Sequence, residues 1–362
     1  MNELEMARNV INAVDTEMAK LFSQRMDAVK TVAEYKKKNG LPIEDPAREA
    51  DMIARNSELI DNIQYRQYYV DFLKSTVEVS KQYQHRLLDG MRVAYSGVSG
   101  AFANIVAEKI FPDANCIGYS DFDTAYKAVS DGECDCVLLP IENSFNGDVS
   151  KVIDLAFFGD LYINGVYEAE IVQNLLAKKG TSIDDITEVI SHPQALGQCA
   201  EYIKKHGFTP VEAVNTAVAV KIVAGYDRTD IAAIGSEEAA KKFGLVKIEA
   251  HINDNSSNTT RFVVFSRVQR EITARDKHFI MLFTVKNEAG SLGRAVSVIG
   301  EHGFNLRALK SRPTKESSWE YYFYAEGDGN LGTFEGKAML AELSACCSSV
   351  KVIASYDKEN KI

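Results

Sequence analysis

The chain has 362 residues, of which 46% are hydrophobic and 25% are charged, a size and composition typical of a globular protein with two or three domains. Acidic residues outnumber basic ones, 51 to 41, and no basic tract occurs, which argues against nucleic acid as a partner. The opening residues are polar, with Glu3 and Glu5, and no apolar run has membrane-spanning length, so we expect a cytoplasmic protein that has no membrane partner.

The first 88 residues predict helices only, with one clear break. Lys38, Asn39 and Gly40 are typical of a helix C-terminus, and Asp45 followed by Pro46 is typical of the next helix start. A third helix is predicted over 64–88.

Charged and polar side chains interrupt the apolar faces of these helices. Arg25 and Lys36 share a face with apolar residues of the first helix, and Ser80 and Gln84 belong to the apolar face of the third. An unpaired buried cation is unfavourable. One interpretation is that Arg25 pairs with Asp15, Asp45 or Glu49, or that both cations extend to water. The other is a pocket for a small polyanion.

Residues 91–268 alternate short apolar runs with amphipathic helical segments, which predicts α/β structure with largely parallel sheets in two sub-domains around a cleft. Polar clusters lie where strands end and helices begin, at 97–103, 140–149, 191–199, 215–220 and 258–262. Ligands of α/β sheets bind at such positions, and helix N-termini there offer N–H groups to carboxylates. The cluster at 97–103 lacks the third glycine of a dinucleotide site and the Gly-Lys-Ser/Thr of a P-loop.

Each cluster also has a purely structural interpretation. His192 before Pro193 could shape a turn, Asn143 and Ser144 could cap a helix, and Thr216 could be a helix N-cap.

Residues 267–277 form a polar linker, and the remainder predicts the order βαββαβ, a ferredoxin-like unit. The six cysteines form no C-x-x-C pair and are expected to be reduced thiols, with no disulfide framework and no metal site. They are Cys116, Cys134, Cys136, Cys199, Cys346 and Cys347.

The N-terminal region resembles the all-helical chorismate mutases in the order and spacing of its polar residues, which are Arg8, Arg25, Lys36, Asp45, Arg48, Glu49, Ser80 and Gln84. The resemblance implies an intertwined homodimer of three-helix chains, with Arg8 reaching into the partner's site. It implies rearrangement of chorismate to prephenate without a cofactor. Arg25 and Arg8 would hold carboxylates with help from Ser80. Lys36 and Gln84 would face the ether oxygen. Glu49, with Asp45, would hold the ring hydroxyl.

The α/β region resembles prephenate dehydratases through "PIENS", "SHPQAL" and "TRF". The resemblance implies a two-lobed fold of the periplasmic-binding-protein type, with prephenate bound in the cleft and no metal or cofactor. Thr260 would assist departure of the ring hydroxide, Arg261 would hold a carboxylate or pin the loop, and Phe262 would pack by the ring. Asn143, Ser144, His192 and Thr216 would contact substrate. Ala103 stands where many members carry a hydroxyl residue.

The C-terminal segment resembles an ACT domain, a module that pairs with a copy of itself to bind amino acids, with phenylalanine as effector in this family. "GSLG" would supply Gly290, Ser291 and Leu292, and "KSRP" would supply Ser311, Arg312 and Pro313. The family form of the second motif begins with glutamate, so Lys310 reverses that charge. Feedback then either survives with altered affinity or is lost.

The expected organisation is a mutase domain over 1–90, a dehydratase domain over 91–268 and a regulatory domain over 277–357. Three alternatives stay open. The same scaffold could act on arogenate, the chain could be a non-catalytic amino-acid sensor, or the first 88 residues could serve only for dimerisation.

Overall fold

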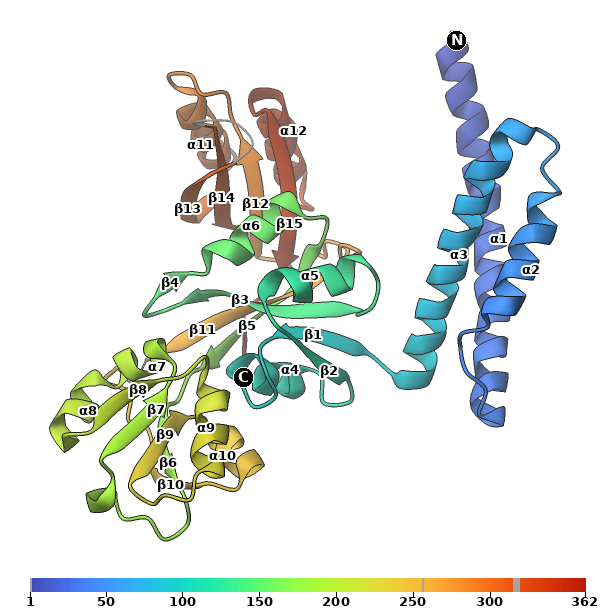
Figure 1. Cartoon of the computed structure of the whole chain (residues 1–362). Helices are drawn as coiled ribbons and strands as arrows, with labels where there is room; N and C mark the ends of the chain where they lie inside the picture. Colours follow the sequence, from blue (N-terminus) through green and yellow to red (C-terminus); the bar gives the residue numbers. More distant parts are fainter. Residues whose placement is uncertain (1, 256, 315–319) are drawn as a thin grey trace. The chain divides into compact units, whose positions relative to one another are not determined.

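A computed structural model describes residues 2–255, 257–314 and 320–362 and divides the chain into two compact units, Met1–Arg92 and Val93–Ile362 (Figure 1). No helix within these described ranges combines the length and apolarity that crossing a membrane requires.

The N-terminal unit is helical, as predicted. Its helices are α1 (Glu3–Asn39), α2 (Pro46–Ser57) and α3 (Ile63–Asp89). Gly40 ends α1 in the left-handed conformation, with φ of 64°, a geometry that glycine adopts without strain. Asp45 caps α2 by accepting a hydrogen bond from the Arg48 amide, and Pro46 occupies the first turn.

The second unit begins with a lobe built on a seven-stranded mixed sheet, in the order β16-β5-β11-β3-β1-β2 with β4 paired to β3. The strands are β1 (Arg92–Ser96), β2 (Asn115–Tyr119), β3 (Cys136–Asn143), β4 (Gly147–Asp148), β5 (Tyr162–Glu170), β11 (Thr259–Ser266) and β16 (Asn360–Lys361). The helices of this lobe are α4 (Phe102–Ile110), α5 (Phe122–Ser130) and α6 (Ser150–Phe158).

A second lobe is built on a five-stranded sheet, in the order β10-β6-β9-β7-β8. The strands are β6 (Asn174–Ala177), β7 (Glu188–Ser191), β8 (Thr209–Glu212), β9 (Ile231–Gly235) and β10 (Val246–Glu249). Its helices are the 3₁₀ turn η1 (Ile183–Asp185), α7 (Pro193–Gln198), α8 (Ala200–His206), α9 (Thr216–Gly225) and α10 (Glu237–Phe243).

The expectation of largely parallel sheets is wrong. β11 runs antiparallel to both β3 and β5, and β6 runs antiparallel to β9 and β10. The reason is the path of the chain, which leaves the first lobe after β5 and returns to it as β11. Because the first residue of β11, Thr259, lies beside the last residue of β5, Glu170, the two strands run in opposite directions.

The C-terminal segment forms a four-stranded antiparallel sheet in the order β13-β14-β12-β15. Its elements are β12 (His278–Thr284), α11 (Ser291–Glu301), β13 (Asn305–Pro313), β14 (Tyr321–Asp328), α12 (Phe334–Cys346) and β15 (Ser349–Tyr356). The predicted order βαββαβ is confirmed.

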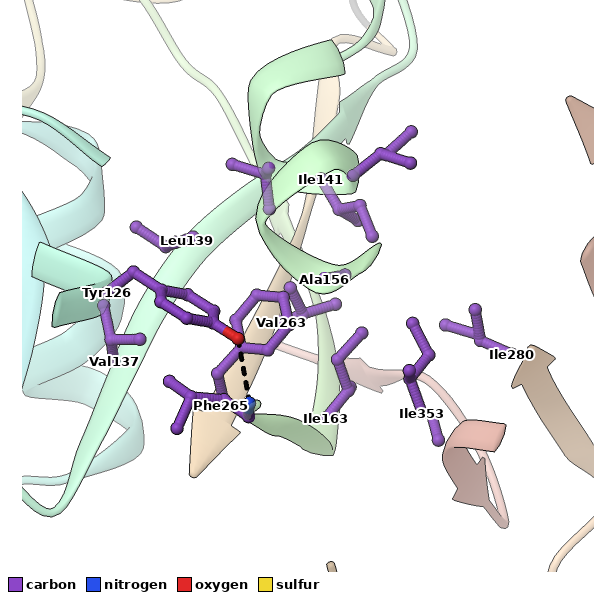
Figure 2. Packing of buried hydrophobic residues seen from close by; sticks show 14 of the residues in the cluster. Tyr126, Val137, Leu139, Ile141, Ala156, Ile163, Val263, Phe265, Ile280 and Ile353 are labelled. Atoms are coloured by element: carbon purple, nitrogen blue, oxygen red, sulfur yellow. Dashed lines mark hydrogen bonds between the residues drawn. The ribbon is translucent and has the colours of Figure 1, made fainter. Parts of the chain in front are cut away.

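The C-terminal sheet and the first lobe share one hydrophobic core. Figure 2 shows Ile280 and Ile353 of the C-terminal sheet on the same cluster as Ile163 and Phe265 of the seven-stranded sheet. The ring of Phe157 on α6 stacks on Tyr322 of β14, with ring centres 3.9 Å apart. Because apolar burial stabilises by about 25 cal/mol per Å², this contact joins the C-terminal sheet firmly to the first lobe.

Candidate active sites

The helical unit contains a cavity of about 270 Å³ lined by residues of α1, α2 and α3 and by the α1–α2 loop. Seven of the eight polar residues singled out from the sequence line it: Arg25, Lys36, Asp45, Arg48, Glu49, Ser80 and Gln84. The helices therefore bring together side chains that lie up to 59 positions apart in the chain.

Arg25 is held by neutral oxygens. Its Nη1 donates to the hydroxyl of Ser80 and, at 3.4 Å, to the carbonyl of Thr76. Among the described residues no ion pair joins Arg25 to Asp15, Asp45 or Glu49. The interpretation that Arg25 pairs with one of these carboxylates is therefore wrong. Burial lowers the pKa of Arg25, the direction expected when a cation is desolvated without a compensating anion.

Other charged groups of the cavity are also bound to neighbouring parts of the protein. The Nζ of Lys36 donates to the carbonyl of Ile43 at 2.5 Å, and Asp45 is occupied as the cap of α2. Glu49 pairs with Lys81 at 3.4 Å, and Lys81 also pairs with Glu78 at 3.0 Å. The hydrogen bond that Lys81 donates to Glu78 raises the pKa of Lys81. Lys81 lines the cavity and was missed from the sequence, although its position four residues after Val77 places it beside the same helix face.

Gln84 is 6% exposed, and its side-chain oxygen has no partner in the part of the chain that the structure describes. Its Nε2 donates to the carbonyl of Ser80 at 3.4 Å, which leaves a second N–H for a ligand. With four cationic and two acidic side chains on its walls, the cavity suits a small dianion that also carries neutral oxygens.

Arg8 does not line this cavity. It lies on the exposed N-terminal part of α1, 17 residues before Arg25, which is about 26 Å along a helix axis. The Arg8 side chain therefore cannot serve the cavity of its own chain.

The second cavity, of about 380 Å³, lies between the two lobes of the second unit. The first lobe contributes Phe102, Ala103, Phe122, Pro140, Asn143, Val149, Thr260 and Phe262, and the second contributes His192, Gln194, Ala195, Gln198, Val214, Asn215 and Thr216. Ile171 and Gln173 line it from the chain segment that crosses between the lobes.

Asn143 and Thr260 face each other across β3 and β11, where they are register partners. The Nδ2 of Asn143 donates to Thr260 Oγ1 at 2.9 Å, and both residues are buried. Asn143 is fixed in turn, because its Oδ1 accepts from the amides of Phe145 and Asn146 at 3.0 and 2.9 Å. The Thr260 oxygen thus accepts from protein, and among described residues no acceptor takes its proton. The O–H is free to donate to a bound ligand.

No Asp, Glu, Lys or Arg is among the described residues that line this second cavity. The N-termini of α4, α7 and α9 lie at its wall instead. No side chain caps α4, so N–H groups of its first turn are available. A carboxylate in this cavity can therefore be held by helix N-termini and neutral donors.

His192 and Thr216 both reach the cavity. His192 is also the N-cap of α7, and its Nδ1 accepts from the Gln194 amide at 3.2 Å. In a neutral ring that bond leaves the proton on Nε2. Thr216 is not an N-cap, because Asn215 caps α9 by accepting from the Val218 amide at 2.8 Å.

Ser144 and Arg261 do not line the cavity. The Oγ of Ser144 donates to the carbonyl of Ser257 at 3.1 Å and accepts from the Thr259 amide at 2.9 Å, so it joins two loops. Arg261 points to the opposite face of β11, because successive strand residues alternate sides. In this structure neither residue is in position to contact a ligand of the cavity. The ion pairs of Arg261 with Glu142 at 2.9 Å and Glu326 at 3.0 Å fit the alternative that Arg261 pins the loop.

Two buried glutamines of the cavity were missed from the sequence. Gln173 is 2% exposed, and its Nε2 donates to Gln198 Oε1 at 3.3 Å. Its own Oε1 has no partner among the described residues. Gln198 belongs to the polar cluster at 191–199, whereas Gln173 follows no recognisable pattern.

None of the residues expected to bind an effector lines either cavity. Gly290, with φ of 84°, precedes α11, which begins with Ser291 and Leu292. On β13, Ser311 and Pro313 are exposed, whereas Arg312 donates to Asp154 of α6 at 2.7 Å. Arg312 therefore binds a carboxylate of the protein itself. No group of three or more His, Cys, Asp or Glu among the described residues is arranged to hold a metal ion.

Comparisons with known proteins match both cavities to enzyme families. Residues 7–85 match the family model of chorismate mutase type II, and residues 93–270 match that of prephenate dehydratase. The chain is 29% identical to the bifunctional chorismate mutase/prephenate dehydratase of Aquifex aeolicus, over 99% of each chain.

Two further similarities concern the second unit. The chain is 32% identical to the chloroplastic arogenate dehydratase/prephenate dehydratase 2 of Arabidopsis thaliana, over 74% of this chain and 72% of the relative. The solved structure of prephenate dehydratase from Arthrobacter aurescens in complex with L-Phe is 26% identical, with a TM-score of 0.68, over 74% of this chain and 90% of that one.

Proposed function

Because the chain belongs to the family of bifunctional chorismate mutase/prephenate dehydratases, we propose that it converts chorismate to prephenate and prephenate to phenylpyruvate in phenylalanine biosynthesis. The observation that carries the proposal is the Asn143–Thr260 pair, which presents a free hydroxyl proton to the interlobe cavity. We assign the first reaction to residues 1–90, the second to 91–268 and regulation to 277–357.

In the mutase step the helical cavity holds a dianion in its reactive shape while a C–O bond breaks and a C–C bond forms. Arg25, backed by Ser80, binds a carboxylate. Lys36 and the free N–H of Gln84 stabilise charge that develops on the ether oxygen. Glu49 accepts from the ring hydroxyl, with Asp45 and Arg48 beside it and Lys81 balancing its charge. Catalysis consists of orientation and electrostatic stabilisation.

In the dehydratase step the substrate loses CO₂ and the ring hydroxyl together, and the ring becomes aromatic. Thr260 donates a hydrogen bond to the departing oxygen, and Asn143 keeps the hydroxyl oriented by occupying its acceptor position. The substrate carboxylates bind at the N-termini of α4 and α9, close to Thr216, with His192 Nε2 as a further donor. Phe262 packs against the ring.

The neutral lining of the interlobe cavity favours prephenate over arogenate. Arogenate differs by an ammonium group, which a buried site would normally match with a carboxylate. The described lining residues offer none, whereas their N–H and O–H donors suit the keto acid. Comparison of kcat/KM for the two substrates tests this preference, and a higher value for arogenate would overturn it.

Regulation by phenylalanine is part of the proposal. The related structure from Arthrobacter aurescens contains L-Phe, and the C-terminal segment has the βαββαβ order that an ACT domain requires. Effector contacts are assigned to Gly290, Ser291 and Leu292 and to Ser311 and Pro313, with Arg312 available only after release from Asp154. Equilibrium dialysis with labelled phenylalanine tests this, and no uptake at millimolar ligand would refute it.

A homodimer completes the mutase site. Large apolar side chains on α1 are exposed in the single chain and recur at heptad spacing, which is typical of a helix that packs on a second helix. They are Leu4, Ile11, Val14, Met18 and Leu21. In such a dimer Arg8 can reach the partner's cavity. All six cysteines are free thiols, which suits the reducing cytoplasm as location.

The function is tested by supplying the purified protein with chorismate and with prephenate in separate reactions. Turnover of both supports the proposal. Binding of either ligand without turnover would favour the amino-acid sensor. Turnover of prephenate but not of chorismate would favour the alternative in which the helical unit serves only for dimerisation.

A further inference from the structure

On the proposed function, we propose that Lys310 of the C-terminal domain is a positioning residue for the dehydratase site, and that it acts with Arg261 through a chain of ion pairs on the reverse face of the catalytic strands. No position in this chain of ion pairs lines the cavity.

The catalytic pair, Thr260 and Asn143, and the ion pair Arg261–Glu142 are neighbouring cross-strand pairs of β11 and β3. Thr260 is opposite Asn143, and the next residues, Arg261 and Glu142, are also register partners. Since side chains alternate in a strand, one pair faces the cavity and the other faces the C-terminal sheet. A shift of either strand in response to the ion pair moves the catalytic pair by the same amount.

The C-terminal sheet holds the ion pair from two strands. Glu326 of β14 is 3% exposed, and both of its carboxylate oxygens accept from Arg261 Nη2 at 3.0 Å, while its Oε1 also accepts from the Tyr324 hydroxyl. Burial opposes the charge of Arg261, but Glu326 together with Tyr324 and Tyr356 outweighs burial and raises the pKa of Arg261. Lys310 of β13 donates to Glu142 at 3.2 Å and also bonds Asp148 of β4.

Lys310 thus joins two carboxylates that face each other. Glu142 and Asp148 are register partners on β3 and β4, and like charges directly opposite one another destabilise a strand pair. Burial opposes the charge of Lys310, but Asp148 and Glu142 outweigh it and raise its pKa. The β3–β4 turn that Lys310 secures contains Phe145 and Asn146, whose amides fix Asn143.

Lys310 can bind Glu142 and Asp148 because it is positively charged, and a glutamate at this position could not. A carboxylate there would be a third negative charge beside Glu142 and Asp148. In this chain the residue is turned toward the dehydratase lobe, while its neighbour Ser311 faces away and is exposed. The positive charge of Lys310, where the family pattern has glutamate, is therefore explained by its ion pairs with Glu142 and Asp148, which join the C-terminal domain to the dehydratase lobe.

The test uses Lys310→Glu, Lys310→Arg and the charge exchange Lys310→Glu with Asp148→Lys. Lys310→Glu is expected to lower the dehydratase kcat roughly tenfold with KM within about twofold, because small displacements of catalytic groups are costly. Lys310→Arg should stay within about twofold, and the exchange should regain most of the loss. Mutase activity in the same chain is the internal control, and Lys337→Glu, on the exposed face of α12, is the matched charge reversal.

Hydrogen–deuterium exchange supplies a readout that needs no activity. Amides of residues 140–149 and 257–262 should exchange faster in Lys310→Glu than in the wild type. Asp148→Asn, a milder change on a short surface hairpin, should show the same pattern more weakly if Lys310→Glu does not fold.

Wild-type kcat and unchanged exchange in Lys310→Glu would overturn the inference. So would equal loss in Lys310→Arg and no recovery in the charge exchange, because the charge would then be irrelevant. A wild-type protein without dehydratase activity would refute the proposed function, and the exchange data would still decide whether Lys310 orders the strands.

Discussion

The Nδ2 of Asn143 lies 2.9 Å from the hydroxyl oxygen of Thr260, and the two residues are cross-strand partners on β3 and β11. This bond fills the acceptor position of the hydroxyl and leaves its proton to be donated. Asn143→Asp reverses the arrangement, because a carboxylate can only accept and would take the Thr260 proton itself.

We predict that Asn143→Asp lowers the dehydratase kcat by about 10²-fold, within the range for loss of a positioned proton donor. The new carboxylate still accepts from Phe145 and Asn146 but can no longer donate to Asn258 Oδ1 and the Thr259 carbonyl, so the melting temperature of the variant is compared with that of the wild type. Steady-state kinetics with prephenate measures the effect, and mutase kinetics on the same sample is the control. An unchanged kcat would show that the direction of this bond is irrelevant.

The helical cavity predicts a charge requirement at Arg25. A charge contact at about 4 Å with an effective dielectric near 20 is worth roughly 4 kcal/mol before desolvation. Arg25→Ala should therefore lower the mutase kcat/KM by about 10²- to 10³-fold. Lys20→Ala, at an exposed position of the same helix, should change it less than about twofold.

Light scattering separates a lost site from a lost assembly in that experiment. A dimer that persists in Arg25→Ala without turnover supports a catalytic cavity. Wild-type mutase activity in Arg25→Ala would contradict a catalytic role of the cavity and favour a purely structural role of the helical unit.

Arg8 offers a test of the shared site. Arg8→Ala and Arg25→Ala should each be inactive as mutases, yet a mixture that exchanges subunits should regain about a quarter of wild-type activity, since half of the dimers of a two-fold assembly then carry one intact site. No recovery after subunit exchange, verified by mass spectrometry, would contradict a site completed by the partner.

Asp276 predicts how stability depends on pH. It is 3% exposed and accepts from Ser355 at 2.7 Å and Thr273 at 2.9 Å, with Arg270 beside it. Burial alone would raise its pKa, but these hydrogen bonds outweigh burial and lower the pKa below its ordinary value of 3.8. A carboxyl whose pKa is lowered by folding adds stability above its ordinary pKa, and this stability disappears as the pH falls through the folded value.

Asp276→Asn should accordingly destabilise the protein by about 1.5–3 kcal/mol at pH 7, the magnitude for hydrogen bonds to a charged group. The difference from the wild type should shrink below about pH 4. Calorimetric unfolding at several pH values checks this, with the exposed Asp123→Asn as control. A difference that is independent of pH would contradict the assignment.

The sequence predicted the parts of the sites that follow from local periodicity. Arg25, Lys36, Ser80 and Gln84 interrupt helical apolar faces, and a helix has only one way to present such residues to its neighbours. Asn143 ends β3 and Thr260 lies at the start of β11, both in polar clusters where strands begin or end, and α/β folds bind ligands in such places.

The site features that the sequence did not predict depend on the alternation of side chains in a strand or on contacts between residues far apart in the chain. The position of Arg261 next to Thr260 in a strand already implied that it faces the other side, so this signal was present and was not used. Gln173 lies in a crossover without a pattern, and Lys310 meets Glu142 from 168 positions away. No local pattern encodes such a contact.

The most direct test gives the purified protein chorismate alone and follows the products by chromatography, with Thr260→Ala beside the wild type. We predict phenylpyruvate from the wild type and accumulated prephenate from Thr260→Ala, because the variant keeps the helical cavity and lacks the donor hydroxyl. Phenylpyruvate formed by Thr260→Ala at the wild-type rate, or prephenate accumulating with the wild type, would contradict the proposed role of the interlobe cavity.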